Sequence, residues 1–362
     1  MTSNGSEPRH ALIVGVTGIT GYSLARHLLE SGWQVSGISR TPPKDLPTLT
    51  PISVDVTDRA STIAALGGHK PTHVFFCSWL RQDTEAENCR VNGGMLRNVL
   101  DALAEHKQSV KHVALTTGLK HYLGPFEAYG TIKPETPFRE DQPRLKYENF
   151  YYTQEDILFE CAERDGFTWS VHRPHSVIGF AVGNAMNMGM TLAVYGTICK
   201  ETGRPFIFPG SPEQYQAVTD VTDARILARH LQWASTTPAA ANQALNIVNG
   251  DQFRWRRMWT VVAHALGVEP AEYPGRPTPL ETYNVGAAAT WKEIAAKYKL
   301  AFDDINTLVS WWHTDADLGR TMETFTDMSK SRRLGFLDYQ QTDYSFIDLF
   351  DELRARKVIP SL

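Results

Sequence analysis

The amino-acid sequence predicts an α/β protein with a doubly wound parallel sheet, and three observations support this prediction. Short apolar runs recur through the first half of the chain and alternate with stretches whose apolar residues follow helical spacing. The runs are continuously apolar, as in strands that are buried on both faces. The first run, at 11–14, ends in Gly15, Gly18 and Gly21, which lead directly into a helical pattern. Such a regular succession favours parallel strands joined by crossover helices.

The stretch from Ala11 to Gly21 is typical of a nucleotide-binding turn. A buried strand is followed by regularly spaced glycines, and Leu24 and Leu28 then recur at helical spacing. Backbone N–H groups at the start of such a helix point outward, and glycines let a pyrophosphate approach the chain. The spacing Gly-x-x-Gly-x-x-Gly resembles that of short-chain dehydrogenases/reductases. An ordinary glycine-rich turn is the alternative, but the order of strand, turn and helix favours a dinucleotide site.

Further elements follow in the expected order. Apolar runs predict strands at 34–39, 52–56, 72–77, 112–116 and 169–174, with a helix at about 84–105. A long connection that contains Pro and Gly then leads into a helix that begins near Tyr147. Past about 179, the patterns predict a helix near 190–200, a short strand at 206–208, a helix from Asp223, a strand at 246–248 and a helix at 255–266. We expect the strand at 246–248 to join the main sheet.

Composition excludes several classes of protein. The 362 residues carry a net charge of −4 and no basic block, which argues against nucleic-acid binding. The 4 cysteines are scattered, so neither a disulfide scaffold nor a zinc site is expected, and we predict no metal. No apolar run is long enough to span a membrane, and the first ten residues are too polar for a signal peptide. We therefore expect a soluble, cytoplasmic protein.

The end of the second predicted strand indicates which cofactor is bound. Enzymes that prefer NAD place an acidic residue near this point, where it binds the ribose hydroxyls. Here the sequence has Ser39, Arg40 and Thr41 instead. A guanidinium can bind a 2′-phosphate with paired hydrogen bonds, so Arg40 favours NADP, although a plain surface arginine is the alternative. Asp55, at the end of the third strand, could accept a hydrogen bond from the adenine amino group or could be a turn residue.

These patterns divide the chain into two expected regions. Residues 1–178 form an NADP-binding Rossmann domain, and residues 179–362 form a mainly substrate-binding C-terminal region. Part of the second region, about 215–250, returns to the Rossmann core. The remaining residues are rich in Pro, Trp and Tyr, and we expect them to cover the nicotinamide end of the site as a lid.

The residues that would carry the chemistry are not in the usual pattern. Short-chain dehydrogenases normally have Tyr-x-x-x-Lys on one helix, where the lysine lowers the pKa of the tyrosine. The literal match, Tyr129 to Lys133, is unsuitable because Gly130 and Pro134 break helices.

Tyr151 lies in the helix that has the right place in the order of elements, but Glu155, not lysine, stands four residues later. Either the protein is a non-catalytic relative or the cation comes from elsewhere. Lys120, just beyond the fifth strand, is the available cation.

Several motifs together resemble the progesterone 5β-reductase/iridoid synthase (PRISE) family of atypical short-chain dehydrogenases/reductases. The most specific of them contain Lys120 and Tyr151. The motifs are Gly15-Val16-Thr17-Gly18, Thr117-Gly118-Leu119-Lys120-His121-Tyr122, Asn149-Phe150-Tyr151-Tyr152, Ser170-Val171-His172-Arg173-Pro174, Asn246-Ile247-Val248-Asn249-Gly250-Asp251, Trp311-Trp312 and Lys330 to Phe336. The resemblance covers nearly the whole chain.

The resemblance implies NADPH-dependent reduction of the carbon–carbon double bond of a small apolar enone or enal. Hydride goes to the β-carbon, Tyr151 hydrogen-bonds the carbonyl oxygen, and Lys120 supports the tyrosine. The expected cofactor-binding residues are Gly15, Thr17, Gly18, Ile19, Arg40, Asp55, Val56, Ser78, Trp79, Thr116, Gly118, Tyr151, Pro174 and Val177. The expected substrate-binding residues are Trp79, Phe126, Tyr151, Met186 and Phe336, with an apolar pocket over which Phe336 reaches.

Some positions depart from the family pattern. His175 stands where the plant enzymes usually have glycine, Leu119 replaces a frequent arginine, and the segment 183–185 differs. The identity of the substrate therefore does not transfer. The alternatives are a carbonyl reductase or sugar-nucleotide epimerase of the extended family, and an NADP-binding regulator without chemistry. A homodimer is compatible with the sequence, which contains no specific signal for it.

Overall fold

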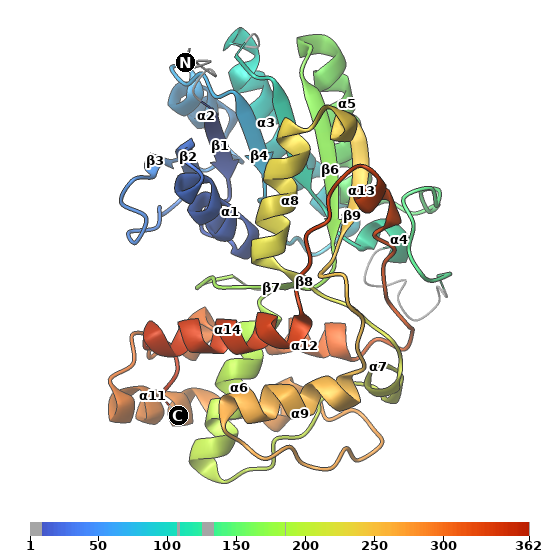
Figure 1. Ribbon diagram of the computed structural model, residues 1–362. Helices are drawn as coiled ribbons and strands as arrows, with labels where there is room; N and C mark the ends of the chain where they lie inside the picture. The colour runs from blue at the N-terminus through green and yellow to red at the C-terminus, as the bar shows by residue number, and fades with distance from the viewer. Residues whose placement is uncertain (1–8, 107–108, 125–133, 185, 362) are drawn as a thin grey trace, which may run out of the picture.

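Seven parallel strands form the central sheet of the computed structural model, in the order β3-β2-β1-β4-β5-β6-β9 (Figure 1). The structure describes residues 9–106, 109–124, 134–184 and 186–361. The strands of the sheet are β1 (His10–Val14), β2 (Gln34–Ser39), β3 (Thr50–Ser53), β4 (His73–Phe76), β5 (His112–Thr116), β6 (Thr168–Pro174) and β9 (Gln243–Ile247). β7 (Val177–Ile178) and β8 (Thr222–Asp223) pair separately.

Successive residues of the central strands pack on opposite faces of the sheet, and both faces are buried. In β1, Leu12 and Val14 join the cluster on one face, whereas Ala11 and Ile13 join the cluster on the other. All four are at most 1% exposed, which explains why the run is continuously apolar. α2 (Arg59–Leu66), α3 (Glu85–Leu103) and α5 (Phe150–Asp165) cover the first face, and α1 (Ile19–Glu30) and α8 (Ala224–Thr236) cover the second.

A second layer of helices lies beyond the carboxyl ends of the strands, in the lower half of Figure 1. Its core contains Tyr195, Phe206, Trp259 and Trp291, all nearly inaccessible to solvent. The helices of this half are α6 (Met188–Thr202), α7 (Pro212–Gln216), α9 (Trp255–Leu266), α10 (Leu280–Tyr283), α11 (Ala287–Tyr298), α12 (Trp311–Leu318) and α14 (Thr342–Ala355). α4 (Lys120–Leu123) and α13 (Ser329–Arg333) lie beside the sheet, and the 3-10 turns are Ala104–His106, Pro238–Ala240 and Ile305–Thr307.

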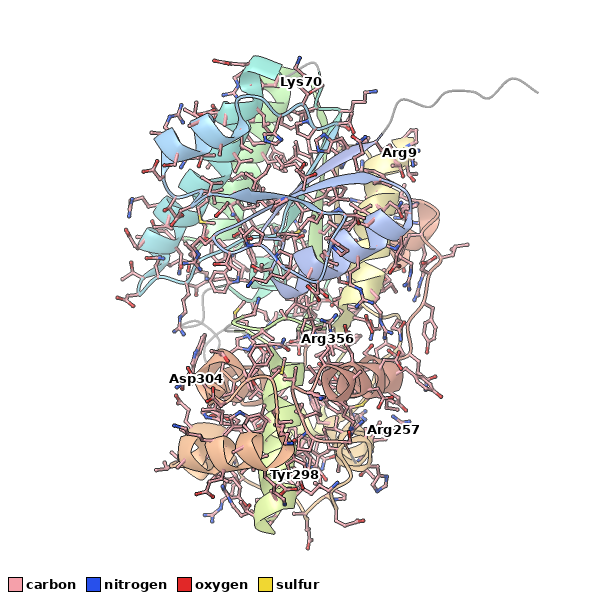
Figure 2. All side chains as sticks on the ribbon, turned by 90° about the vertical axis from the view of Figure 1, so that its left-hand side faces the viewer. Arg9, Lys70, Arg257, Tyr298, Asp304 and Arg356 are labelled. Atoms are coloured by element: carbon pink, nitrogen blue, oxygen red, sulfur yellow. The ribbon has the colours of Figure 1, made fainter. Side chains whose placement is uncertain are left out.

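The two halves meet along α14. Arg356, just after this helix, donates hydrogen bonds to Asp45 at 2.7 Å and to the hydroxyl of Tyr22 at 2.7 Å. Figure 2 shows Arg356 at the level where the sheet half and the helical half join. The helical half is therefore attached to the sheet half by side chains from the very end of the chain.

Most predicted elements are present, and two differ. The strand predicted at 246–248 is β9, which pairs with β6 and extends the main sheet as expected. The short strand predicted at 206–208 is wrong, because only an isolated bridge between Phe206 and Pro270 forms there. The third strand ends at Ser53 instead of at 56, since Asp55 starts a turn with Thr57. Among the described residues, no helix combines the length and apolar character needed to cross a lipid bilayer.

Candidate active site

A cleft lies at the carboxyl ends of the parallel strands, where the strand order reverses between β1 and β4. It consists of two adjoining cavities of about 340 Å³ and about 200 Å³. Residues that line both of them are Gly18, Cys77, Ser78, Trp79, Asn184 and Met186. A third cavity lies between α1, α8 and α14. None of the predicted site residues lines it, although Ile178 and Gly179, which follow the predicted residue Val177 in the chain, do.

The larger cavity begins at the glycine turn. Gly15 has a φ of +86°, and a Cβ placed on it would lie 3.0 Å from the Cβ of Ser78. A Cβ on Gly21 would lie 2.2 Å from the carbonyl oxygen of Gly15, so the turn closes against the helix only because this position has no side chain. No side chain caps the start of α1, and its first turn contains no acidic residue. The turn therefore suits a bound phosphate group, which would accept hydrogen bonds from the helix N–H groups.

The far end of the larger cavity is lined by Arg40 and Asp55. Arg40 is exposed, at the end of β2. Asp55 accepts hydrogen bonds from the backbone N–H of Thr57 at 2.9 Å and from its hydroxyl at 2.7 Å. These bonds lower the pKa of Asp55 below its ordinary value, so the carboxylate is charged. Asp55 is thus a turn residue that also lines the cavity. Asp58 caps α2 through the N–H of Ser61.

The smaller cavity contains Tyr151 and Lys120. A Cβ placed on Gly118 would lie 3.1 Å from the Tyr151 hydroxyl oxygen and 3.4 Å from the carbonyl oxygen of Pro174. The phenol therefore lies over the chain where β5 and β6 end, at a position where a Cβ would crowd its hydroxyl. Lys120 is only 8% exposed, and its ammonium lies 4.8 Å from the ring of Phe150.

Asn149 connects the two predicted catalytic residues. Its side-chain oxygen accepts a hydrogen bond from the backbone N–H of Tyr151 at 3.0 Å, which caps the start of α5. Its amide nitrogen donates to the backbone carbonyl of Lys120 at 2.9 Å. One buried amide thus fixes the backbones of Lys120 and Tyr151 relative to each other.

Two acidic residues near the site have different surroundings. Glu85, at the start of α3, lies 2.5 Å from the Lys120 ammonium, a pairing that no sequence pattern indicates. Glu155, which occupies the position of the usual lysine, lines neither cavity and is bound by Arg173 at 3.1 Å and Arg144 at 2.8 Å. Burial acts to raise the pKa of Glu155, but His121 and these arginines lower it to about 2. Glu155 is therefore a charged structural residue that faces away from the cleft.

Part of the lining of the smaller cavity is polar, beside apolar residues such as Phe150, Met186 and Met188. His175 lies within 2.7 Å of Asp220 on one side and 2.7 Å of Arg320 on the other. Arg320 also pairs with Asp317, which accepts a hydrogen bond from Ser176. Burial acts to raise the pKa of Asp317, but the charge of Arg320 outweighs it and lowers the pKa. His175 thus links the loop after β6 to Asp220 and to Arg320, which lies just after α12.

The C-terminal wall of the cleft comes from α12. Trp312 lines the larger cavity, with the guanidinium of Arg81 3.7 Å from its ring centre, and His313 lines the smaller one. The predicted role of Phe336 is wrong. Phe336 is 3% exposed and packs against His230 and Trp233 of α8, at 4.6 and 5.3 Å between ring centres. The chain after α13 returns to the face of the sheet that α8 covers, away from the cleft.

Apart from Phe336, the predicted site residues fall into two groups. Those that line the cleft are Gly15, Thr17, Gly18, Ile19, Arg40, Asp55, Val56, Ser78, Trp79, Thr116, Gly118, Lys120, Tyr151, Pro174, Val177 and Met186. Phe126 and the stretch from Tyr129 to Lys133 lie outside the described residues, as does position 185. Within the described part of the chain, no cluster of His, Cys, Asp and Glu is suited to hold a metal ion.

The strand order and the uncapped glycine turn define a Rossmann-type nucleotide-binding protein. Solved structures with similar folds include UDP-glucose 4-epimerase from Thermotoga maritima with UDP-glucose, at a TM-score of 0.68 and 13% identity over 96% of this chain and 99% of that one. UDP-glucose 4-epimerase from Bifidobacterium longum in complex with NAD+ and UDP has a TM-score of 0.66 and 15% identity, over 96% and 99% of the two chains. At these identities, the likeness is one of fold alone.

Within that class, residues 56–360 match the family model described as a PRISE-like Rossmann-fold domain. An (S)-8-oxocitronellyl enol synthase of Nepeta racemosa is 41% identical over 97% of this chain and 93% of its own length. A 3-oxo-Δ(4,5)-steroid 5β-reductase of Arabidopsis thaliana is 39% identical over 97% and 93% of the two sequences. The chain belongs to the PRISE family.

Proposed function

We propose that this protein is an NADPH-dependent reductase of the carbon–carbon double bond in α,β-unsaturated ketones and aldehydes. The observation that supports this function is the position of Tyr151 and Lys120 on the wall of one cavity that runs on into the nucleotide cleft. The steroid 5β-reductase and the enol synthase among its relatives are similar over nearly the whole chain.

The cofactor would occupy the larger cavity and extend into the smaller one. The N–H groups at the start of α1 would hold the pyrophosphate, Arg40 the 2′-phosphate and Asp55 the adenine amino group. When bound, NADPH supplies the hydride that adds to the β-carbon of the substrate.

Tyr151 stabilises the charge that develops during reduction. Its phenol donates a hydrogen bond to the carbonyl oxygen of the substrate, which becomes an enolate oxygen as the β-carbon is reduced. The ammonium of Lys120 stabilises the same negative charge from a longer distance. Trp79, which stacks on Phe150 at 5.5 Å between ring centres, and Met186 exclude water from this part of the cavity. Protonation of the enolate then gives the saturated carbonyl compound.

Two alternatives predict different products. A carbonyl reductase or an epimerase of the extended family would use a lysine four residues after the tyrosine, and here that position is the buried Glu155. A regulator without chemistry would bind the cofactor only. NADPH consumption with cyclohexenone, followed by product analysis, separates the three. A saturated ketone supports the proposal, an allylic alcohol supports the carbonyl reductase, and NADPH binding without turnover supports the regulator.

Cofactor preference tests the role of Arg40. We expect the native protein to prefer NADPH, and Arg40→Glu to move the preference toward NADH by about 10- to 100-fold, because a charge-assisted hydrogen bond is lost and a repulsion is added. Steady-state kinetics with both cofactors measures the shift. Lys44→Glu is the matched control, since it makes the same charge change at an exposed residue that does not line the cavity. Equal use of NADH and NADPH by the native protein would contradict this role.

A further inference from the structure

The carboxylate of Glu85 contacts Lys120 and also the first residue of α5, the helix that carries Tyr151. The proposed reaction depends on Lys120 and Tyr151. One oxygen lies 2.5 Å from the ammonium of Lys120, and the other accepts a hydrogen bond from the backbone N–H of Phe150 at 2.8 Å. Phe150 is the first residue of α5 and directly precedes Tyr151. Asn88, one turn along α3, donates a further hydrogen bond to the same carboxylate at 3.2 Å.

These contacts are largely shielded from solvent. The side chains of Lys120 and Glu85 are 8% and 12% exposed. A buried ion pair is weak evidence for added stability, because desolvation of the two charges offsets much of their attraction. The loss of one partner is costly, however, since it leaves the other charge buried without compensation. The pair therefore controls the charge beside Tyr151 as well as the positions of the groups around it.

We propose that Glu85 is a positioning residue for the reduction, acting through Lys120 and the start of α5. This inference rests on the proposed function. The carboxylate holds the ammonium of Lys120, a residue that lines the same cavity as Tyr151, and it fixes the first N–H of the helix that carries Tyr151. Together with Asn149, which joins the backbones of the same two residues, it makes Lys120 and Tyr151 one rigid unit.

The proposal predicts an unusual pattern for combined substitutions. Lys120→Met removes the cation and leaves the carboxylate of Glu85, which contacts a residue of the cavity wall, without its counter-ion, so that its negative charge opposes the enolate charge that develops in that cavity. Adding Glu85→Gln removes that opposing charge, while the amide oxygen can still accept a hydrogen bond from Phe150. We therefore expect the double variant to be at least about 10-fold faster than Lys120→Met alone, although Glu85→Gln by itself slows the native protein. Two independent structural losses would add instead.

The experiment measures single-turnover oxidation of bound NADPH by cyclohexenone, together with thermal melting of each variant. Glu87→Gln is the matched control, because it removes the same charge two residues further along α3, where the side chain is exposed and pairs with Arg90. In the Lys120→Met background, this control should leave the rate unchanged.

The outcomes separate the inference from the function on which it rests. Recovery of the rate by Glu85→Gln, but not by Glu87→Gln, supports the positioning role. Additive losses overturn it, and so does recovery of the melting temperature without recovery of the rate, since that is the pattern of a structural pair. Absence of enone reduction in the native protein overturns the proposed function, whereas the melting data then still decide whether the two charges depend on each other.

Discussion

Replacing Tyr151 by phenylalanine should lower kcat for a simple enone by about 10²–10³-fold, the usual effect of deleting one oxyanion donor. The substitution keeps the aromatic ring, whose centre lies 4.4 Å from that of Phe150, and removes only the hydroxyl that lies over Gly118. NADPH affinity and the melting temperature should therefore change little. Stopped-flow measurement of NADPH oxidation, with binding measured by fluorescence, gives both quantities.

The substrate dependence of this loss tests the mechanism further. Enones with a second electron-withdrawing group form enolates that need less stabilisation, so the loss should be smaller for them. Tyr129→Phe, in the literal Tyr-x-x-x-Lys match, is the matched control and should have little effect. If Tyr129→Phe abolished activity while Tyr151→Phe retained it, the assignment of the site would be wrong.

Acidification below pH 6.5 should destabilise the protein through its buried histidines. A row of buried histidines runs from β5 through β6 to α8. His112 and His172 both contact the hydroxyl of Ser170 at 2.8 Å, and His172 contacts His230 at 2.9 Å. Burial lowers the pKa of His112 and of His230 to about 3, and lowers that of His172 well below its usual value.

The direction of the effect follows from proton uptake. Above pH 6.5 these histidines are neutral in both states, so they contribute no pH dependence. Below pH 6.5 the unfolded chain binds protons that the native state does not, and the fall in the free energy of unfolding steepens toward about 1.4 kcal/mol per pH unit for each histidine. For three histidines the limiting fall is about 4 kcal/mol per pH unit, a large part of a typical domain stability.

Urea unfolding at pH 7.0, 6.0 and 5.5 measures this slope. His230→Gln cannot take up a proton, so its slope should be smaller, by a difference that approaches about 1.4 kcal/mol per pH unit at the acid end of this range, whatever its stability at pH 7. His264→Gln is the control, because His264 is exposed near the end of α9 and should leave the slope unchanged. A native stability that stays constant down to pH 5 would contradict the prediction.

The parts of the site that lie within one short stretch of sequence were predictable. The turn from Gly15 to Gly21 and the end of β2 at Arg40 have spacings that a single strand or helix end imposes, and the structure places them around one cavity. Lys120 and Tyr151 could be brought together only through the family resemblance, because they lie on separate elements.

Contacts between distant segments were not predictable. Glu85 is 35 residues before Lys120 and resembles an ordinary acidic residue in the first turn of a helix. Phe336 is aromatic and near the end of the chain, which suits a lid as well as a core, and only the path of the chain after α13 decides between them. The contacts of His175 with Asp220 and Arg320 depend likewise on how the loop after β6 meets two distant segments, one just before β8 and one just after α12.

The position of β9 has a consequence for making chimeras of related enzymes. β9 pairs along β6, and α8 covers the sheet beside α1, although both come from the chain after the helical half has begun. A chimera joined once at residue 178 would therefore set β6 of one parent against β9 of the other and place the mismatch inside the sheet. Exchanging the helical half between two relatives requires three inserted segments, one before β8, one between β9 and α13 and one after Phe336, because α13 and Phe336 pack against the sheet half. The last segment also carries Arg356, which must match the Tyr22 and Asp45 of its new host.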